Sequence, residues 1–441
     1  MRARSRTPSL APTSALDHAL EALARNDPEA CLRHAVPALA DVGADAPAAD
    51  LVGRAAVMLG AMAVARPAFE TAARALAVQG MAGHAIAAAL AVHRLTGSDT
   101  VLTELARVFG ADAQRTEASS VRPPPLASVE VSALPDTTPR ADLLSQARAG
   151  IDALAKGLPA TLPVRTRHPL WGSLPPGAFE RFARALEVRI CPTGEQVITE
   201  GEPGQSVFVV ARGEVRVVRG AGDDAVELAV LGAESVFGEM ALLTDGPRAA
   251  SARTTRAAVL LEAPREALEE AALEVPAVGD ELGAWGRRRL VANLVRMSAL
   301  LREVPPGARE TLVDAFETVR HAAGEVVVAE GDPAPGLYLL ATGRVEVRRR
   351  EADGQDLVVA TIGPGGCVGE VSLVLRRPAS ATVVALVPTV SLVLRPERFL
   401  AVVHEHPELL ASLYALAVER SEELNTVVAQ VAVDADDLVI V

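Results

Sequence analysis

The sequence predicts a multidomain α+β fold, in which an N-terminal all-α domain of helical hairpins precedes two tandem antiparallel β domains with flanking helices. Three observations predict it. Residues 13–112 are rich in Ala and Leu at helical spacing. From about residue 187 onward, short β-branched runs alternate with glycine turns, which is typical of a small sandwich or barrel. The text of this β region then occurs a second time.

Composition limits the function classes that the chain can belong to. Its 441 residues are half hydrophobic and 22% charged, which supplies packed cores. A net charge of −13 argues against general affinity for nucleic acid or anionic membranes. The three cysteines, Cys31, Cys191 and Cys367, are odd in number and far apart, which fits a reducing compartment.

No targeting or membrane signal is evident in the sequence. The basic N-terminus lacks the apolar core of a signal peptide. The longest apolar run near it, at 55–65, is about half of the roughly 20 residues that a spanning helix needs. We therefore expect a cytoplasmic protein that has neither DNA nor a membrane as a partner.

The N-terminal domain, 13–112, reads as five or six short helices. Ser14 is a suitable N-cap for a helix whose apolar residues follow the 3.6-residue period. Breaks are predicted at Asn26-Asp27-Pro28, at Ala46-Pro47 and at Gly97-Ser98-Asp99.

Residues 66–97 look like one helical hairpin that turns at Gly80. Such hairpins resemble the tetratricopeptide class, but most of its aromatic and proline positions are missing here. A plain helical bundle is the alternative. Either way, the small-residue faces suggest a module that docks a protein partner. Residues 113–163, rich in Pro, Ser and Thr at their start, are predicted to be a linker with a connecting helix.

The β region is an internal repeat. Residues 192–217 match 322–347, and FGEMALLTDGPRAAS at 237–251 matches VGEVSLVLRRPASAT at 368–382. Short strands are expected at Val207–Val210 and Glu214–Val218. A lead-in helix precedes each copy (174–187 and 304–317) and a helical stretch follows each (264–300 and 396–431). The predicted β domains are 164–296 and 297–431, followed by an acidic tail at 432–441.

These ordered positions, and above all the FGEMAL…PRAAS segment, resemble the cyclic-nucleotide-binding domain family of kinase A regulatory subunits, gated channels and catabolite activator proteins. The resemblance covers roughly 165–431. It implies, for each copy, an eight-stranded β-roll of jelly-roll type with helices on both sides. The ligand is then held on a short turn inside the roll.

The residue chemistry of the first copy agrees with such a ligand. Arg248 can meet phosphate oxygens with a planar fork, and Gly238 lets the backbone turn. Glu239 suits the ribose 2′-hydroxyl, since beside the phosphate it would repel it. The predicted cyclic-nucleotide site comprises Phe237, Gly238, Glu239, Met240, Ala241, Arg248, Ala249, Ala250 and Ser251. The alternative is a Glu239–Arg248 pair that pins the loop and holds no ligand.

By the resemblance, the residue after the arginine influences the choice of base, and Ala249 favours cyclic AMP over cyclic GMP. The second copy departs from the family. It keeps the glycine and the glutamate, but alanine stands where the first copy has Arg248, and Arg376 and Arg377 precede Pro378. We expect a structural domain there, with a weak second site as the alternative. The degenerate site comprises Gly369, Glu370, Ala379, Ser380 and Ala381.

Other motifs predict no further chemistry. GPGGCVG at 363–369 lacks a Walker lysine, so it reads as a turn. His404 and His406 lack a third ligand, which argues against a metal site. No nucleophile motif and no DNA-reading helix is evident in the sequence. We therefore expect a non-enzymatic sensor without a cofactor, which binds cyclic nucleotide in the first β domain and signals through helices to a protein partner. The alternative is an interaction or scaffold protein whose β domains no longer bind nucleotide.

Overall fold

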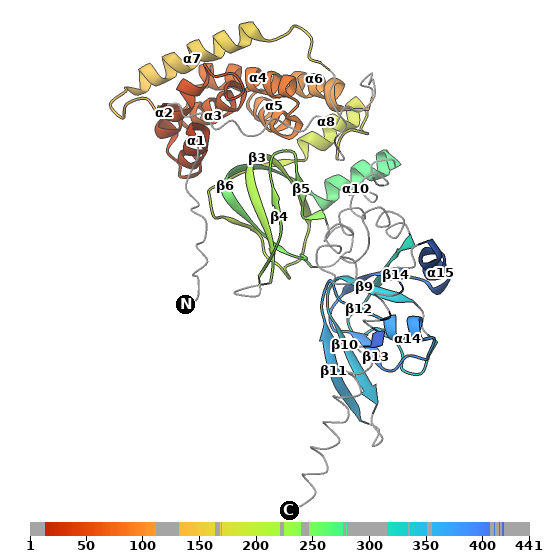
Figure 1. Ribbon diagram of the computed structural model, residues 1–441. Helices are drawn as coiled ribbons and strands as arrows, with labels where there is room; N and C mark the ends of the chain where they lie inside the picture. The colour runs from red at the N-terminus through yellow and green to blue at the C-terminus, as the bar shows by residue number, and fades with distance from the viewer. Residues whose placement is uncertain are drawn as a thin grey trace, which may run out of the picture. The chain divides into compact units, whose positions relative to one another are not determined.

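The computed structural model describes residues 14–111, 132–163, 168, 170–220, 225–239, 247–276, 279, 315–333, 336–350, 355–405, 410, 414 and 417–418 (Figure 1). The chain divides into two compact units. The first contains Met1–Leu242 and Ala250–Ala284, and the second contains Leu243–Ala249 and Trp285–Val441. The N-terminal helices and the first β domain therefore share one unit.

The first unit begins with helices joined by short turns. Their bounds are α1 (Ala15–Ala24), α2 (Pro28–Ala38), α3 (Asp45–Met58), α4 (Met62–Gln79), α5 (Ala82–Thr96) and α6 (Thr100–Phe109). The side chain of Ser14 caps α1 by accepting a hydrogen bond from the Asp17 N–H, at 3.2 Å. Helix α4 ends at Gly80, with φ +81°, and α5 returns antiparallel to it. The predicted cap and hairpin are confirmed.

One predicted break is wrong. Ala46 and Pro47 lie in the first turn of α3, which begins at Asp45, rather than between two helices. The N–H groups of a first helical turn have no intrahelical acceptor, so a proline there removes no hydrogen bond.

The predicted connecting helix, α7 (Arg140–Gly157), lies along α2, α3 and α4 (Figure 1). Leu143, Ala147 and Ile151, spaced by four residues, form its fully buried stripe. The apolar stripe of α7 has to be covered by other helices, so α7 packs on the N-terminal ones. The helical layer therefore extends beyond the predicted 13–112. Residues 112–131 of the predicted linker lie outside the described residues.

The first β domain is a single antiparallel sheet between two helices. Its elements are α8 (Pro176–Arg184), β1 (Glu187–Cys191), β2 (Gln196–Ile198), β3 (Ser206–Arg219), β4 (Val226–Leu231), β5 (Val236–Phe237), β6 (Ser251–Pro264) and α10 (Arg265–Glu274). The strand order is β1-β6-β3-β4, with β2 also paired to β6 and β5 to β3. Alternate inward side chains, Phe208, Val210, Val215 and Leu260 among them, form its core.

The two short strands predicted at Val207–Val210 and Glu214–Val218 are one continuous strand, β3. Gly213 bends it with φ +96°, and a Cβ at this position would lie 2.4 Å from the Ala257 carbonyl oxygen. Only glycine allows this approach, so pairing with β6 continues through the bend.

In the residues that the structure describes, the second unit has eight strands in two antiparallel sheets. Its elements are β7 (Glu317–His321), β8 (Val326–Val328), β9 (Leu337–Thr342), β10 (Val345–Arg350), β11 (Asp356–Ile362), β12 (Cys367–Val368), α14 (Glu370–Leu375), β13 (Thr382–Ala385), β14 (Thr389–Leu394) and α15 (Pro396–Glu405). The sheet orders are β11-β10-β13-β8 and β12-β9-β14-β7. The lead-in helix predicted at 304–317 falls, apart from its last residues, outside the described residues.

The sequence repeat is also a repeat of hydrogen bonds. The Glu200 N–H donates to the Ser251 hydroxyl at 3.0 Å, and the Glu330 N–H donates to the Thr382 hydroxyl at 3.1 Å. Both glutamate carboxylates then accept a backbone N–H twenty residues onward, at 2.7 and 2.9 Å. The two β domains therefore share these hydrogen bonds as well as the sequence pattern.

The three cysteines are buried and free. Burial raises the pKa of the Cys191 thiol to about 12, which keeps it protonated and unreactive. Among the helices that the structure describes, none is both long and apolar enough to cross a bilayer.

Candidate functional site

The predicted nucleotide segment begins at the end of β5, inside the first β domain. Phe237 pairs with Phe208 of β3, and the two buried rings stack with their centroids 5.2 Å apart. Gly238 follows with φ +84°, a left-handed conformation that side chains other than glycine rarely adopt. The chain therefore turns sharply out of the sheet just before Glu239.

Glu239 and Arg248, the two predicted ligand contacts, are both buried, with 5% and 8% of their surfaces exposed. Buried charges are costly unless they are paired, and both residues interact with other groups of the protein. Met240 and Ala241 lie outside the described residues.

The remaining predicted contacts lie at the start of β6. Ala249 and Ala250 are half-buried, and Ser251 opens the strand. The hydroxyl of Ser251 accepts the Glu200 N–H, so the segment is fastened to the loop after β2.

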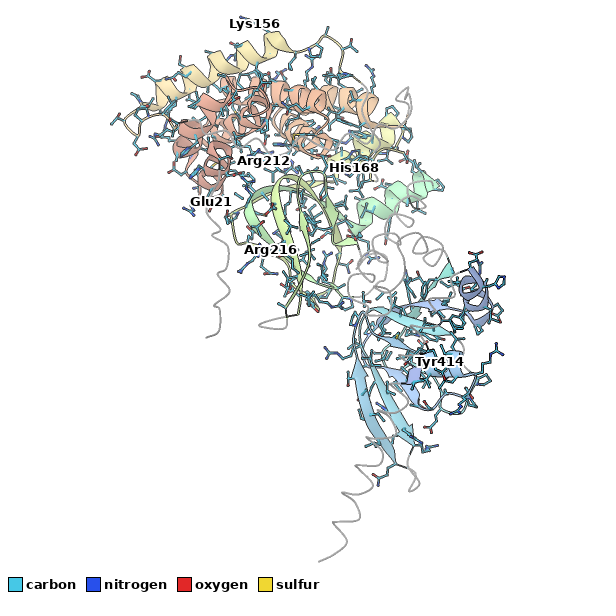
Figure 2. The ribbon with its side chains drawn as sticks, viewed as in Figure 1. Glu21, Lys156, His168, Arg212, Arg216 and Tyr414 are labelled. Carbon is cyan, nitrogen blue, oxygen red and sulfur yellow. The ribbon has the colours of Figure 1, made fainter. Side chains whose placement is uncertain are left out.

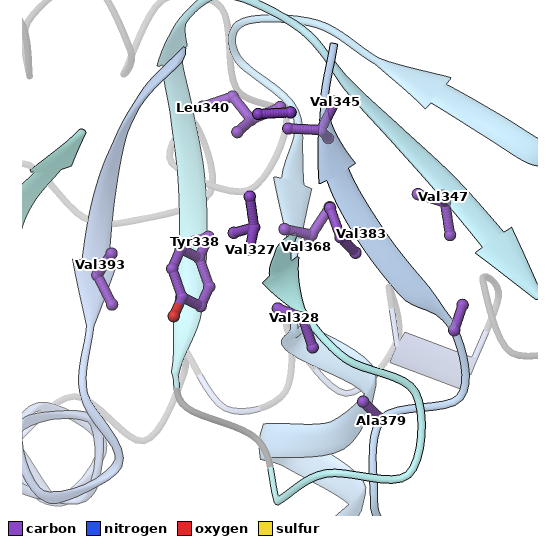
Figure 3. Packing of buried hydrophobic residues seen from close by; sticks show 12 residues of the cluster. Val327, Val328, Tyr338, Leu340, Val345, Val347, Val368, Ala379, Val383 and Val393 are labelled. Carbon is purple, nitrogen blue, oxygen red and sulfur yellow. The ribbon is translucent and has the colours of Figure 1, made fainter. Parts of the chain in front are cut away.

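In the second copy, the position that matches Arg248 belongs to the apolar core. Ala379 is 5% exposed and lies in a cluster with Val328 and Tyr338 (Figure 3). Arg376 and Arg377 are both exposed. Gly369 has φ +85° and Glu370 opens α14, so the copy keeps the turn without an arginine at the matching position. Of the other two residues of this degenerate site, Ser380 is exposed and Ala381 is buried.

A second feature, which the sequence did not predict, joins the turn before the predicted nucleotide segment to the helices. Glu234 lies in the turn between β4 and β5, five residues before Glu239. Its carboxyl oxygens both accept the Gly83 N–H at 3.0 Å, and the N–H groups of Ala82 and His84 also stabilise it. Glu234 thus caps the first turn of α5, whose own N-cap residue makes no side-chain hydrogen bond.

Burial raises the pKa of Glu234 to about 8, although these backbone hydrogen bonds oppose the shift. The residue also has φ +63°, which costs a non-glycine residue about 1 kcal/mol. Burial of the carboxyl group and the left-handed backbone both cost free energy, so the surrounding structure must hold Glu234 in this position.

Helix α1 is tied to the same sheet by a buried ion cluster. Asp17 accepts hydrogen bonds from Arg212 of β3, at 3.4 Å, and from Arg256 of β6. Burial would raise the pKa of Asp17, but the two guanidinium groups outweigh it and lower the pKa. Glu21 of α1 accepts the Thr193 N–H at 3.0 Å. Figure 2 shows Glu21 and Arg212 where the helices meet the sheet.

A comparison of the two copies of the repeat could have indicated this interface from the sequence. At three positions whose side chains contact the helices, the second copy has a residue that cannot make the same side-chain contact. The pairs are Arg212 and Thr342, Glu234 and Gly365, and Arg256 and Val387. Differences between the copies therefore mark where the helices bind the first one.

The Gly-rich run and the histidine pair, which the sequence analysis did not regard as sites, form no other candidate site in the described residues. Residues 363–366 form the turn between β11 and β12, as predicted for GPGGCVG. His404 is exposed on α15, and His406 lies outside the described residues. The described part of the chain contains no group of His, Cys, Asp and Glu side chains suited to a metal ion.

Comparison with known proteins places both β domains in one family. The model of the cyclic nucleotide-binding domain matches residues 188–274 and 318–406. A cAMP-dependent protein kinase regulatory subunit of Yarrowia lipolytica is 30% identical over 216 residues, 49% of this chain and 54% of the relative. The type II regulatory subunit of Drosophila melanogaster is 26% identical over 216 residues, with the same coverage. The chain thus spans about half the length of these relatives.

Solved structures with the same kind of domain include the regulatory domain of Toxoplasma gondii PKA with cAMP, at 21% identity. The match covers 58% of this chain and 93% of that one, with a TM-score of 0.30. The catabolite activator protein of Thermus thermophilus is 30% identical and covers 31% of this chain and 63% of its own, with a TM-score of 0.29. With the family model matched twice, this chain carries two cyclic nucleotide-binding domains in tandem, at residues 188–274 and 318–406.

Proposed function

We propose that the chain is a non-catalytic regulatory protein that binds cyclic AMP in its first domain and signals to a protein partner. The observation that carries the proposal is the difference between two otherwise matching copies. The first has a buried glutamate and a buried arginine in the binding segment, whereas the second has Glu370 and a core alanine. A buried arginine that is absent from a copy of the same fold is not needed by the fold itself, which favours a ligand role.

Each residue of the proposed site has a role that its chemistry supports. Arg248 offers a bidentate fork to the single charge of the cyclic phosphate. Glu239 accepts the ribose 2′-hydroxyl, and Gly238 lets backbone N–H groups face the ligand. Ala249 and Ala250 leave room for the phosphate. Phe237, Met240, Ala241 and Ser251 complete the segment that surrounds it.

The route of the signal follows from the position of Glu234. It lies five residues before Glu239 and is bonded to the first turn of α5. A shift of the binding segment on nucleotide binding would therefore move the cap of α5 and bias the helical layer. The helices then act as part of the sensor, rather than as a separate module on a linker.

The partner is proposed from chemistry and from the relatives' names. The helical layer presents a surface for a protein, and the matched relatives are named as regulatory subunits of a cAMP-dependent protein kinase. We infer that a protein, with a kinase as the first candidate, receives the signal. No metal or prosthetic group is part of the proposed site.

Isothermal titration calorimetry of the full chain against cyclic AMP, cyclic GMP and linear AMP tests the proposal. We expect cyclic AMP to bind most tightly, and linear AMP to bind weakly because its phosphate has a different shape and a second charge. Absence of heat with all three nucleotides would contradict the sensor function. That result would favour a scaffold protein built on the same domains.

A further inference from the structure

A cavity in the first unit is separate from the nucleotide segment and is used by none of the functions above. Its volume is about 270 Å³, and it lies where α1, α3, α4 and α5 face β1. Phe69, Ala87 and Leu23 are buried at its base, whereas Met58 and Leu95 are exposed at its edge. Exposed apolar side chains around an apolar hollow are typical of a binding site.

Strand β1, which closes the cavity on one side, has apolar side chains facing it. Val188 and Ile190 of β1 line the cavity, while Arg189 between them lies over the ring of Phe208 on the other face. At the matching positions the second copy has Thr318 and Arg320. The apolar pair is therefore a feature of the first copy alone and is not required by the β domain.

Two arginines give this apolar cavity a charged side. Arg54 bonds to Asp50 at 2.9 Å and lies 5.8 Å from the centre of the Phe69 ring. Its Nη2 is buried and has no hydrogen-bond partner among the described residues. Arg94 donates to the Leu186 carbonyl at 3.2 Å and is otherwise exposed at the cavity.

The charges around the cavity do not cancel. Asp50 also accepts a hydrogen bond from His84 at 3.0 Å, and burial lowers the pKa of that imidazole, so His84 adds no positive charge at neutral pH. Burial would raise the pKa of Asp50, but Arg54 and His84 together hold it at about 2. Of these groups, Asp50 neutralises one guanidinium, and a net charge of about +1 remains on the cavity side.

We propose that this cavity binds a small amphipathic carboxylate, an apolar chain or ring that ends in one carboxyl group. The apolar walls take the body of the ligand, and the exposed guanidinium of Arg94 takes the carboxylate, with the charge of Arg54 beside it. The volume lies just below the range of about 300–1,000 Å³ that is usual for small-molecule sites, which suits one short chain and excludes a peptide helix.

Sodium decanoate, kept below its micelle concentration, is the probe for calorimetry on the full chain, with decanol and propionate as controls. We expect one decanoate site per chain. Decanol should bind at least tenfold more weakly because it lacks the charge, and propionate should give no heat because it lacks the apolar body. Equal binding of decanol and decanoate would overturn the role of the arginines.

Two variants locate the site. Ala91→Leu on α5 adds bulk to the cavity and should weaken decanoate binding at least tenfold. Arg94→Gln should weaken it severalfold, whereas Arg107→Gln, an exposed arginine on α6 outside the cavity, should not. Unchanged binding in Ala91→Leu, with the fold intact by circular dichroism, would show that decanoate binds elsewhere. Arg248→Ala should leave decanoate binding unaltered, so that this site and the nucleotide site succeed or fail separately.

Discussion

At the scale of single residues, the first domain has ionisable side chains where the second has small or apolar groups. Arg248 corresponds to a core alanine, and Glu234 corresponds to Gly365, which has the same left-handed backbone. A folded protein tolerates such polar groups away from water only when hydrogen-bond or ionic partners satisfy them. These residues of the first copy therefore indicate contacts that the second copy does not make.

Replacement of Arg248 by alanine is expected to remove most cyclic-nucleotide affinity and to leave the domain folded. Loss of a charge-assisted contact of about 1.5–3 kcal/mol corresponds to a decrease of roughly ten- to a hundredfold or more. Lysine should restore little, since it offers a point charge in place of a fork. Calorimetry measures the effect, with Arg253→Ala, an exposed arginine of β6, as the matched control. Unchanged affinity in Arg248→Ala would refute the assignment.

Glu234 is expected to make the stability of the first unit depend on pH. A glutamate in the unfolded chain ionises near its ordinary value of 4.5, whereas the folded protein holds the proton up to about pH 8. Between these values the folded state binds more protons, so the free energy of unfolding falls as pH rises. Glu234→Gln, which keeps the shape and cannot ionise, should remove this fall.

Urea denaturation of both proteins between pH 5 and 8 measures the difference. His84 and His168 contact the same region, and burial lowers the pKa of both, that of His168 to about 3. They give stability that rises with pH, but both proteins carry them, so their effect cancels in the comparison. Parallel pH profiles for the two proteins would mean that Glu234 is ionised throughout.

At the scale of elements, α1 and α5 are bonded to the β domain through ionisable side chains. Helix α1 contributes Asp17 and Glu21, and α5 receives Glu234 at its first turn. In the other direction, Arg94 near the end of α5 donates to Leu186 just before β1. Each helix is thus fixed at defined points, which positions the cavity between them and β1.

Asp17→Ala is expected to destabilise the first unit by about 3–5 kcal/mol, because it leaves Arg212 buried without its counter-charge. Asp152→Ala is the control, since its pair with Arg148 is half exposed and worth about 0–1 kcal/mol. Urea denaturation of the full chain gives both values. A loss in Asp17→Ala no larger than in the control would show that the cluster contributes nothing to docking of α1.

At the scale of the whole molecule, the two copies share a framework and differ in their charged residues. One copy carries the charged candidate segment and the contacts to the helices. The other fills the matching space with apolar side chains and keeps the hydrogen-bond framework (Figure 3). Since the framework is shared, the fold itself does not require the residues that differ between the copies.

The asymmetry predicts one tight nucleotide site per chain. Calorimetry of the full chain with cyclic AMP should give a stoichiometry near one. Arg377→Ala should not alter it, because Arg377 is exposed and follows Arg376 in a left-handed conformation, with φ +50°, away from the core. Two equivalent sites would contradict the asymmetry, and a weak second site lost in Arg377→Ala would assign it to the shifted arginine.

The net charge of −13 predicts that the chain has no general affinity for DNA. A gel shift with genomic fragments, with and without cyclic AMP, should reveal no salt-sensitive complex at any protein concentration below the micromolar range. A sequence-specific complex in this assay would contradict the proposal that the partner is a protein and not DNA.

The sequence by itself determined the repeat, the tandem β domains and the candidate ligand segment. These features are local or rest on a comparison of the chain with itself. Ser14, Gly80 and the run Phe237–Gly238–Glu239 act through neighbours a few residues away, so short-range spacing was enough to predict their backbone. The single strand β3 and the position of α7 were missed, because pairing and docking decide them.

Only the tertiary structure decided which surfaces meet. Gly83 and Glu234 are 151 residues apart, and Asp17 and Arg212 are 195 residues apart. Sequence periodicity cannot predict that such residues meet, because each residue fits the pattern of its own helix, strand or turn whether or not the other is present. The packing of the helices on the first β domain brings them together, and it also creates the cavity between α5 and β1. Ionisable side chains that packing removes from water need hydrogen-bond or ionic partners within the protein. In the first unit these partners lie across the contact between the helices and the β domain, and so they join the proposed sensor to its helices.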